Sequence, residues 1–120
     1  MIKGYAGRVL EVDLESQTFA FSPLDQDIAR DYIGGKGYGT RLLYDRTEAG
    51  LDPLGPGNLL IFATGPLNGS VAPQSNRFAV ITKSPLTGGI GNSTCGGSFS
   101  LGMKKAGIDV RFEAKAYRLV

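Results

Sequence analysis

The chain is organised around residues 65–97, which read GPLNGSVAPQSNRFAVITKSPLTGGIGNSTCGG. Glycine-rich loops surround one short apolar strand, predicted over residues 78–82, and Arg77 lies where loop becomes strand. Glycine lets a ligand approach the main chain closely, and an arginine among exposed N–H groups suits phosphate or another oxyanion. The stretch favours an anion-binding surface that cradles a cofactor. The alternative is a set of tight turns that join the strands of an ordinary β-rich domain.

A helix is predicted next, over residues 99–106, with Gly107 as the residue that ends it. Lys104 would then lie near the negative end of the helix, while Gly96 and Gly97 would lie at its positive N-terminus. Exposed N–H groups at a helix N-terminus attract anions. This placement gives the predicted anion site a second component.

The N-terminal part of the chain predicts a β-hairpin. Residues 8–14 alternate, with Leu10, Val12 and Leu14 on one face, which is the period of a half-buried strand. Residues 18–22 repeat the alternation after a short polar turn, so the two segments should pair.

Two short helices should follow the hairpin. Asp25 is the predicted N-cap of the first, and Gly34 its predicted end. The run GGKGYG (residues 34–39) resembles a nucleotide-binding loop, but such loops follow a strand, and this one follows a helix. We therefore expect these glycines to permit close helix–helix or helix–sheet packing, with Lys36 exposed or reaching toward the anion site.

The remaining strands are less regular. Residues 59–63 form a continuous apolar run typical of a central strand, and residues 109–112 form the last predicted strand, with Arg111 inside it. Residues 90–94 are too polar to assign. The pattern predicts a single α+β domain over residues 1–120, β-rich with mixed or antiparallel sheets and a few short helices.

Composition limits the function classes. A net charge of +2, with scattered Lys and Arg, gives no reason to expect nucleic acid as a partner. The chain has no His and one Cys, so it cannot form a zinc ribbon or a four-thiolate iron–sulfur site from its own residues. No apolar run is long enough to span a membrane, and we expect a cytoplasmic protein.

The order of motifs resembles one known family. GRVLEVDL, the Gly-Gly-x-Gly run, NLLIFATGPLNG, SVAPQSNR, TKSPLTGG and GGSF followed by KKAGID occur in the order and close spacing of the N-terminal domain of aldehyde:ferredoxin oxidoreductases. The resemblance extends over residues 7–116.

The resemblance implies a tungsten or molybdenum enzyme that oxidises aldehydes to carboxylic acids and passes electrons through a [4Fe–4S] cluster to ferredoxin. In this family two pterin dithiolenes hold the metal, Mg²⁺ bridges their phosphates, and the N-terminal domain is the β-rich base beneath them. Dithiolene sulfur is a soft anionic donor, so the domain need not supply a metal ligand.

The family's functional positions can be matched to this sequence. Arg77 matches the arginine that contacts the pterin cofactor. The segment Thr94, Cys95, Gly96 and Gly97 falls where the family has Asn-Ser-Gly-Gly, whose asparagine gives a backbone carbonyl to Mg²⁺. Thr94 replaces that asparagine, and Asn92 is a second candidate for the carbonyl. Cys95 is either a reactive thiol or, as we expect, a small buried residue.

The chain departs from the family in two respects. Its end reads Glu113, Ala114, Lys115, Ala116 in place of Glu-Gly-Lys-Ala, which predicts a rearranged tail. The family's enzymes are also several hundred residues long, with cluster cysteines and catalytic residues in later domains. We therefore expect a fragment, subunit or truncated relative that needs its remaining domains, self-associates alone and has no activity by itself. The competing hypothesis is a non-catalytic module of the same fold that binds a phosphorylated small molecule or a partner subunit.

Overall fold

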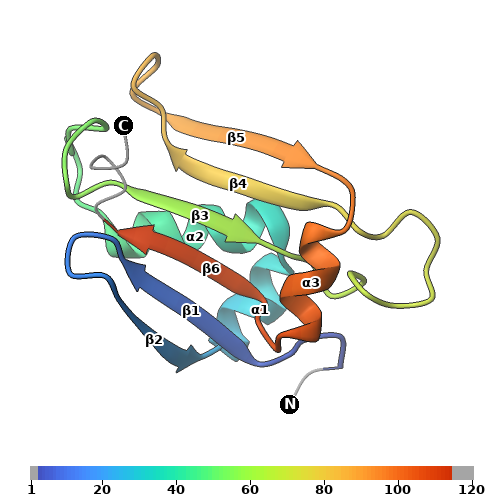
Figure 1. Ribbon diagram of the computed structural model, residues 1–120. Coiled ribbons are helices and arrows are strands. Elements are labelled where there is room, and N and C mark those ends of the chain that lie inside the picture. The colour runs from blue at the N-terminus through green and yellow to red at the C-terminus, as the bar shows by residue number, and fades with distance from the viewer. Residues whose placement is uncertain (1–2, 115–120) are drawn as a thin grey trace.

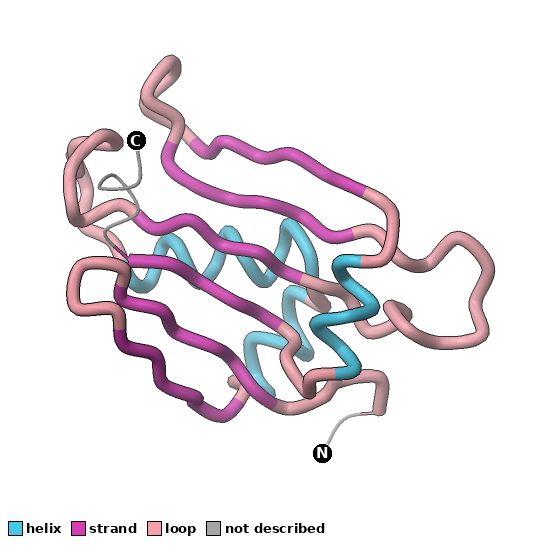
Figure 2. The backbone as a smooth tube through the Cα atoms, in the orientation of Figure 1, coloured by secondary structure: helices cyan, strands magenta, loops and turns pink. Residues whose placement is uncertain are grey.

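The computed structural model describes residues 3–114 as one mixed sheet with helices on both faces. The six strands lie in the order β2-β1-β6-β3-β4-β5. Helices α1 and α2 lie behind the sheet in Figure 1, and α3 crosses one end of the front face; Figure 2 shows the same layers. The expected β-rich α+β fold with short helices is confirmed. In chain order the elements are β1 (Arg8–Asp13), β2 (Thr18–Pro23), α1 (Gln26–Tyr32), α2 (Gly35–Arg46), β3 (Leu59–Ala63), β4 (Phe78–Lys83), β5 (Ile90–Cys95), α3 (Phe99–Lys105) and β6 (Val110–Ala114).

The predicted N-terminal hairpin forms, with β1 and β2 antiparallel and Leu10 opposite Phe21. The alternation along β1 is also confirmed, but the face that packs against the main core is that of Val9, which is buried. Leu10 and Val12 are half-buried on the opposite face. Both faces of β1 are therefore partly apolar, which a period of two alone does not reveal.

Helix α1 begins as the sequence predicts. The Asp25 carboxylate accepts hydrogen bonds from the main-chain N–H groups of Asp27 and Ile28, at 2.9 and 3.0 Å. The helix ends at Ile33, which adopts a left-handed φ of 66°, an unusual conformation for a β-branched residue. Two N–H groups at the start of α1 are thus satisfied within the protein.

The GGKGYG run forms the start of α2 and makes the close contacts expected of it. A Cβ at Gly39 would lie 2.5 Å from Cδ1 of Ile81 in β4, so the glycine brings the helix against the sheet. A Cβ at Gly34 would lie 2.8 Å from the Thr64 carbonyl oxygen. Neither contact leaves room for a side chain, so close packing accounts for these glycines and no nucleotide-binding role is needed to explain them.

The main core lies between the sheet and helices α1 and α2. Its fully buried members alternate along the central strands, as expected for the covered face of a sheet. On the strands they include Ile61, Ile81, Val110 and Phe112, and Leu43 of α2 belongs to the same core. The prediction that residues 59–63 form a central strand is confirmed, because β3 lies between β6 and β4.

Among residues 3–114, α3 covers one end of the front face of the sheet. There Phe99 of α3 packs on Phe62 and Phe78, with ring centroids 5.8 and 4.9 Å apart. Farther along this face, Arg111 forms an ion pair with Glu113 and lies over the Phe62 ring. The arginine predicted inside the last strand therefore lies on the side opposite the main core.

Helix α3 ends before Gly107, as predicted, and Lys104 has a structural partner. Its ammonium nitrogen lies 2.5 Å from the Asp109 carboxylate, and both side chains are buried. Asp109 also accepts hydrogen bonds from the N–H groups of Ala6 and Gly7. Asp109, just before β6, therefore joins the N-terminal segment to α3.

Candidate functional site

Arg77 and Thr94 form the centre of the predicted cofactor site. Arg77 immediately precedes β4, Thr94 lies in the edge strand β5, and a guanidinium nitrogen of Arg77 donates a hydrogen bond of 3.3 Å to Thr94 Oγ1. Both residues are exposed. The structure thus brings together a fixed positive charge and a hydroxyl at one end of the β4–β5 pair.

The other predicted residues divide between the two faces of β5. Asn92 and Thr94 lie opposite Ile81 and Ala79, so they share the face toward α2. Cys95 lies opposite Phe78, on the α3 side. Arg77, Thr94 and Asn92 therefore share a face, whereas Cys95 does not belong to their group.

The expectation that Cys95 is buried is wrong. Its side chain is exposed, and the thiol donates a 3.4 Å hydrogen bond to the Gly96 carbonyl oxygen. The physical reason is its position, because it ends an edge strand on the partly uncovered face of the sheet. Free cysteine is usually buried, which is why burial was expected, but the sequence does not show that Cys95 lies on an edge strand.

Gly96 and Gly97 connect β5 to α3 with their main chain exposed. No atom lies within 4 Å of a Cβ built at either residue. Gly97 has a φ of 92°, whereas Gly96 is not among the glycines with positive φ. Nothing within residues 3–114 therefore excludes a side chain at Gly96, and a flat group could lie directly against this main chain.

Helix α3 does begin directly after these glycines, as expected. It has only seven residues, and Ser98 at its N-cap makes no side-chain capping bond. A helix this short has a weak dipole, so Arg77 supplies the stronger attraction for an anion.

Sequence reasoning missed Asn68 in the loop between β3 and β4. Asn68 is buried, its side-chain amide donates a 2.9 Å hydrogen bond to the Arg77 carbonyl oxygen, and its Oδ1 accepts a 2.6 Å bond from the Gly65 N–H. The only signal in the sequence is the position of this asparagine within Gly-Pro-Leu-Asn-Gly, a pattern typical of turns.

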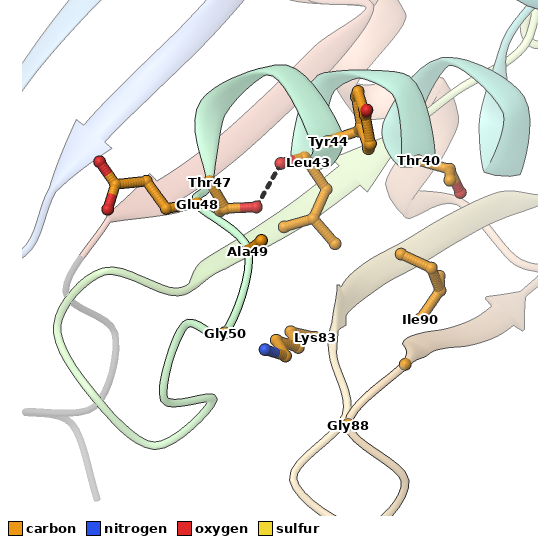
Figure 3. A pocket seen from close by; sticks show the side chains of 11 residues that line it. Thr40, Leu43, Tyr44, Thr47, Glu48, Ala49, Gly50, Lys83, Gly88 and Ile90 are labelled. Carbon is orange, nitrogen blue, oxygen red and sulfur yellow. Dashed lines mark hydrogen bonds between the residues drawn. The ribbon is translucent and has the colours of Figure 1, made fainter.

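A separate cleft lies at the opposite end of β4 and β5. It has a volume of about 590 Å³ between α2 and the β4–β5 turn, and none of the six predicted residues lines it. In Figure 3, Leu43 and Ile90 face each other across this cleft, with Lys83 at its lower edge. The Lys83 ammonium group donates a 2.6 Å hydrogen bond to the Leu51 carbonyl oxygen, which ties the connector after α2 to β4. The predicted anion site and this cleft are therefore separate features.

The residues at Arg77 fit an anionic cofactor that brings its own metal ligands. They offer an exposed guanidinium, a hydroxyl and open glycine main chain. Within residues 3–114, no group of three or more His, Cys, Asp or Glu side chains could hold a metal ion.

No helix in this part of the chain is long and apolar enough to cross a membrane.

Comparison with known proteins identifies the family. Residues 9–118 match the family model described as the N-terminal domain of aldehyde ferredoxin oxidoreductase. The chain belongs to this family. It is 42% identical over 114 residues to the tungsten-containing aldehyde ferredoxin oxidoreductase of Pyrococcus horikoshii, a match that covers 94% of this chain and 19% of that protein.

Two further relatives of this aldehyde ferredoxin oxidoreductase domain carry other names. The WOR-like subunit of aliphatic sulfonate oxidoreductase from Pyrococcus furiosus is 34% identical over 119 residues, which covers 93% of this chain and 19% of that protein. A solved structure, the active site complex BamBC of benzoyl coenzyme A reductase with 1,5-dienoyl-CoA, matches with a TM-score of 0.91 and 36% identity, over 96% of this chain and 18% of that one. The chain thus spans about a fifth of the length of the relatives it matches.

Proposed function

We propose that this chain is the cofactor-binding N-terminal part of a tungsten or molybdenum bis-pterin oxidoreductase that oxidises aldehydes to carboxylic acids with ferredoxin as electron acceptor. Membership of the aldehyde ferredoxin oxidoreductase family supports the proposal, as does 42% identity to a relative named as tungsten-containing. The observation that carries it is the exposed Arg77 guanidinium bonded to Thr94, which lies two residues before the exposed main chain of Gly96.

Each part of the site has a distinct role in this proposal. Arg77 binds the pterin or its phosphate through charge-assisted hydrogen bonds. Gly96 and Gly97 let the cofactor approach the main chain. The backbone carbonyl of Thr94, or that of Asn92, would be the protein's ligand for Mg²⁺. When bound, the metal cofactor supplies the two-electron chemistry of aldehyde oxidation.

The proposal requires protein beyond this chain. Cys95 is the single cysteine in the sequence, so a [4Fe–4S] cluster needs cysteines from elsewhere. The partners are therefore the remaining domains of the enzyme and, through the whole enzyme, ferredoxin. We also expect the chain on its own to self-associate and to lack aldehyde oxidation activity.

The test compares cofactor content between two charge-removing variants. The complete gene is expressed anaerobically with tungstate, and tungsten and pterin are measured per protein in the wild type, Arg77→Ala and Arg30→Ala. Arg30 is the matched control, an exposed arginine on α1 paired with Asp27. Losing the charge-assisted contact should weaken cofactor binding by about 1.5–3 kcal/mol, a factor of ten or more, in Arg77→Ala alone. A wild type without pterin would contradict the proposed function. Equal tungsten and pterin content in all three proteins would show that Arg77 does not bind the cofactor.

A further inference from the structure

Asn68 joins the main chain of Arg77 to the centre of the sheet. Its side-chain amide nitrogen donates a hydrogen bond to the Arg77 carbonyl oxygen, and its side-chain oxygen accepts one from the Gly65 N–H. Its main-chain N–H donates a 3.2 Å hydrogen bond to the Gly65 carbonyl oxygen. Gly65 follows Thr64, whose N–H and hydroxyl both donate to the Asp109 carbonyl oxygen, at 3.0 and 2.7 Å. Hydrogen bonds, together with the peptide bond between Thr64 and Gly65, therefore connect Asp109, just before β6, to Arg77.

Thr94 acts at the other end of the same arginine. Its hydroxyl accepts from the Arg77 guanidinium, and its main chain is held in the β4–β5 ladder opposite Ala79. The backbone of Arg77 and its guanidinium are thus each held by a different residue. Arginine carries some of the largest side-chain entropy of any residue, and ordering it before binding lowers the entropy lost when a ligand is bound.

We propose that Asn68 and Thr94 are positioning residues for Arg77, with Asn68 placing its main chain and Thr94 orienting its guanidinium toward the cofactor. This inference rests on the proposed function of the Arg77 site. It assigns the Thr94 side chain a role separate from that of its carbonyl, because the hydroxyl bonds to the arginine. The phosphate-bearing pterin cofactor would then meet an arginine that is already oriented.

A structural role alone predicts different behaviour for the two residues. Asn68 is buried, so its removal leaves the Gly65 N–H and Arg77 carbonyl unpaired and lowers stability whatever the cofactor does. Thr94 is exposed on an edge strand, where valine has the same shape and a high strand propensity. Thr94→Val therefore removes the hydroxyl acceptor while leaving the fold and the Thr94 carbonyl in place.

The experiment measures tungsten and pterin retained per protein after dialysis, together with the rate of pterin loss, in the complete gene product. The variants are Thr94→Val, Thr94→Ser, Asn68→Ala, Arg77→Ala and the double variant Thr94→Val/Arg77→Ala. We expect about fivefold lower retention in Thr94→Val, near-normal retention in Thr94→Ser, and the double variant equal to Arg77→Ala. Asn68→Ala should also lose cofactor, with its melting temperature measured in parallel.

The outcomes separate the two proposals. If Arg77→Ala loses cofactor while Thr94→Val retains it, the positioning role is wrong and the proposed function stands. The same holds if Thr94→Val lowers retention by an equal factor in the presence and absence of Arg77, because the two residues then act independently. If Arg77→Ala itself retains the full cofactor, the positioning role is overturned together with the assignment of Arg77.

Discussion

Gly37 in α2 packs directly against the main-chain carbonyl oxygen of Tyr32 at the end of α1, with no room for a Cβ between them. The contact is with backbone, which cannot turn aside as a flexible side chain could. The angle between α1 and α2 therefore depends on the absence of a side chain at this position.

Gly37→Ala should lower the free energy of unfolding by about 1–3 kcal/mol, the usual range for an overpacked contact, even though alanine favours helices. Gly102→Ala is the matched control, because Gly102 is exposed in α3 and no atom lies within 4 Å of its Cβ position. It should stabilise the protein by up to about 1 kcal/mol. Urea unfolding of both variants checks this, and equal effects would show that α1 can move away from α2.

Gly96→Ala should lower cofactor content without lowering stability. Its Cβ would contact nothing in residues 3–114 and its φ is not left-handed, so any collision would be with a group outside these residues, and we expect that group to be the cofactor. Gly97→Ala should lower both quantities, because a φ of 92° costs an alanine about 1 kcal/mol or more. Thermal melting and pterin analysis measure the two effects separately. Full pterin content in Gly96→Ala would place the cofactor away from this loop.

Lys104→Met should destabilise the protein by about 3–5 kcal/mol, because the buried Asp109 carboxylate would lose its charged partner. Lys105→Met removes the same charge from the neighbouring residue, which is exposed, and should change stability by less than about 0.5 kcal/mol. Denaturant midpoints at neutral pH give both values. Similar midpoints for the two variants would mean that the N-terminal segment does not depend on this ion pair.

Alkaline pH should destabilise the protein through Tyr38. Burial raises the pKa of Tyr38 above its ordinary value of 10.0, so the folded state holds this proton more tightly than the unfolded state. The stabilisation is complete below pH 10 and is lost as the pH rises from there through the raised pKa. Tyr38→Phe should show a smaller decline in melting temperature above pH 10 than the wild type. An identical decline would assign the effect to another group.

Local patterns in the sequence predicted most of the individual elements. Asp25 marks the start of α1 because a carboxylate that accepts main-chain N–H groups acts within one helical turn. Gly107 marks the end of α3 because its left-handed φ of 79° suits glycine. Each signal depends only on neighbouring residues, so one sequence is enough to read it.

The missed features depend on residues that are distant in the sequence or on position at the sheet edge. Strand β5 pairs on one side only, so its exposed residues, such as Asn92 and Ser93, carry no hydrophobic period. Asn68 was missed because its partner Arg77 lies across a loop. The candidate site was predicted through the family resemblance and the Arg77 motif, whereas the contact between Arg77 and Thr94 required the register of β4 and β5.

The parallel pairing of β1 with β6 has a consequence for how the protein folds. The strand nearest the N-terminus lies beside the last described strand, and the hydrogen bond from Ala6 to Asp109 joins residues 103 positions apart. Contacts this distant in sequence slow folding, because a long loop must close before they form. During synthesis, β1 and Ala6 cannot form these contacts until Asp109 and β6 have left the ribosome. A nascent chain stalled before residue 109 should therefore keep the N-terminal hairpin accessible to protease, while one extended well past residue 114 should protect it.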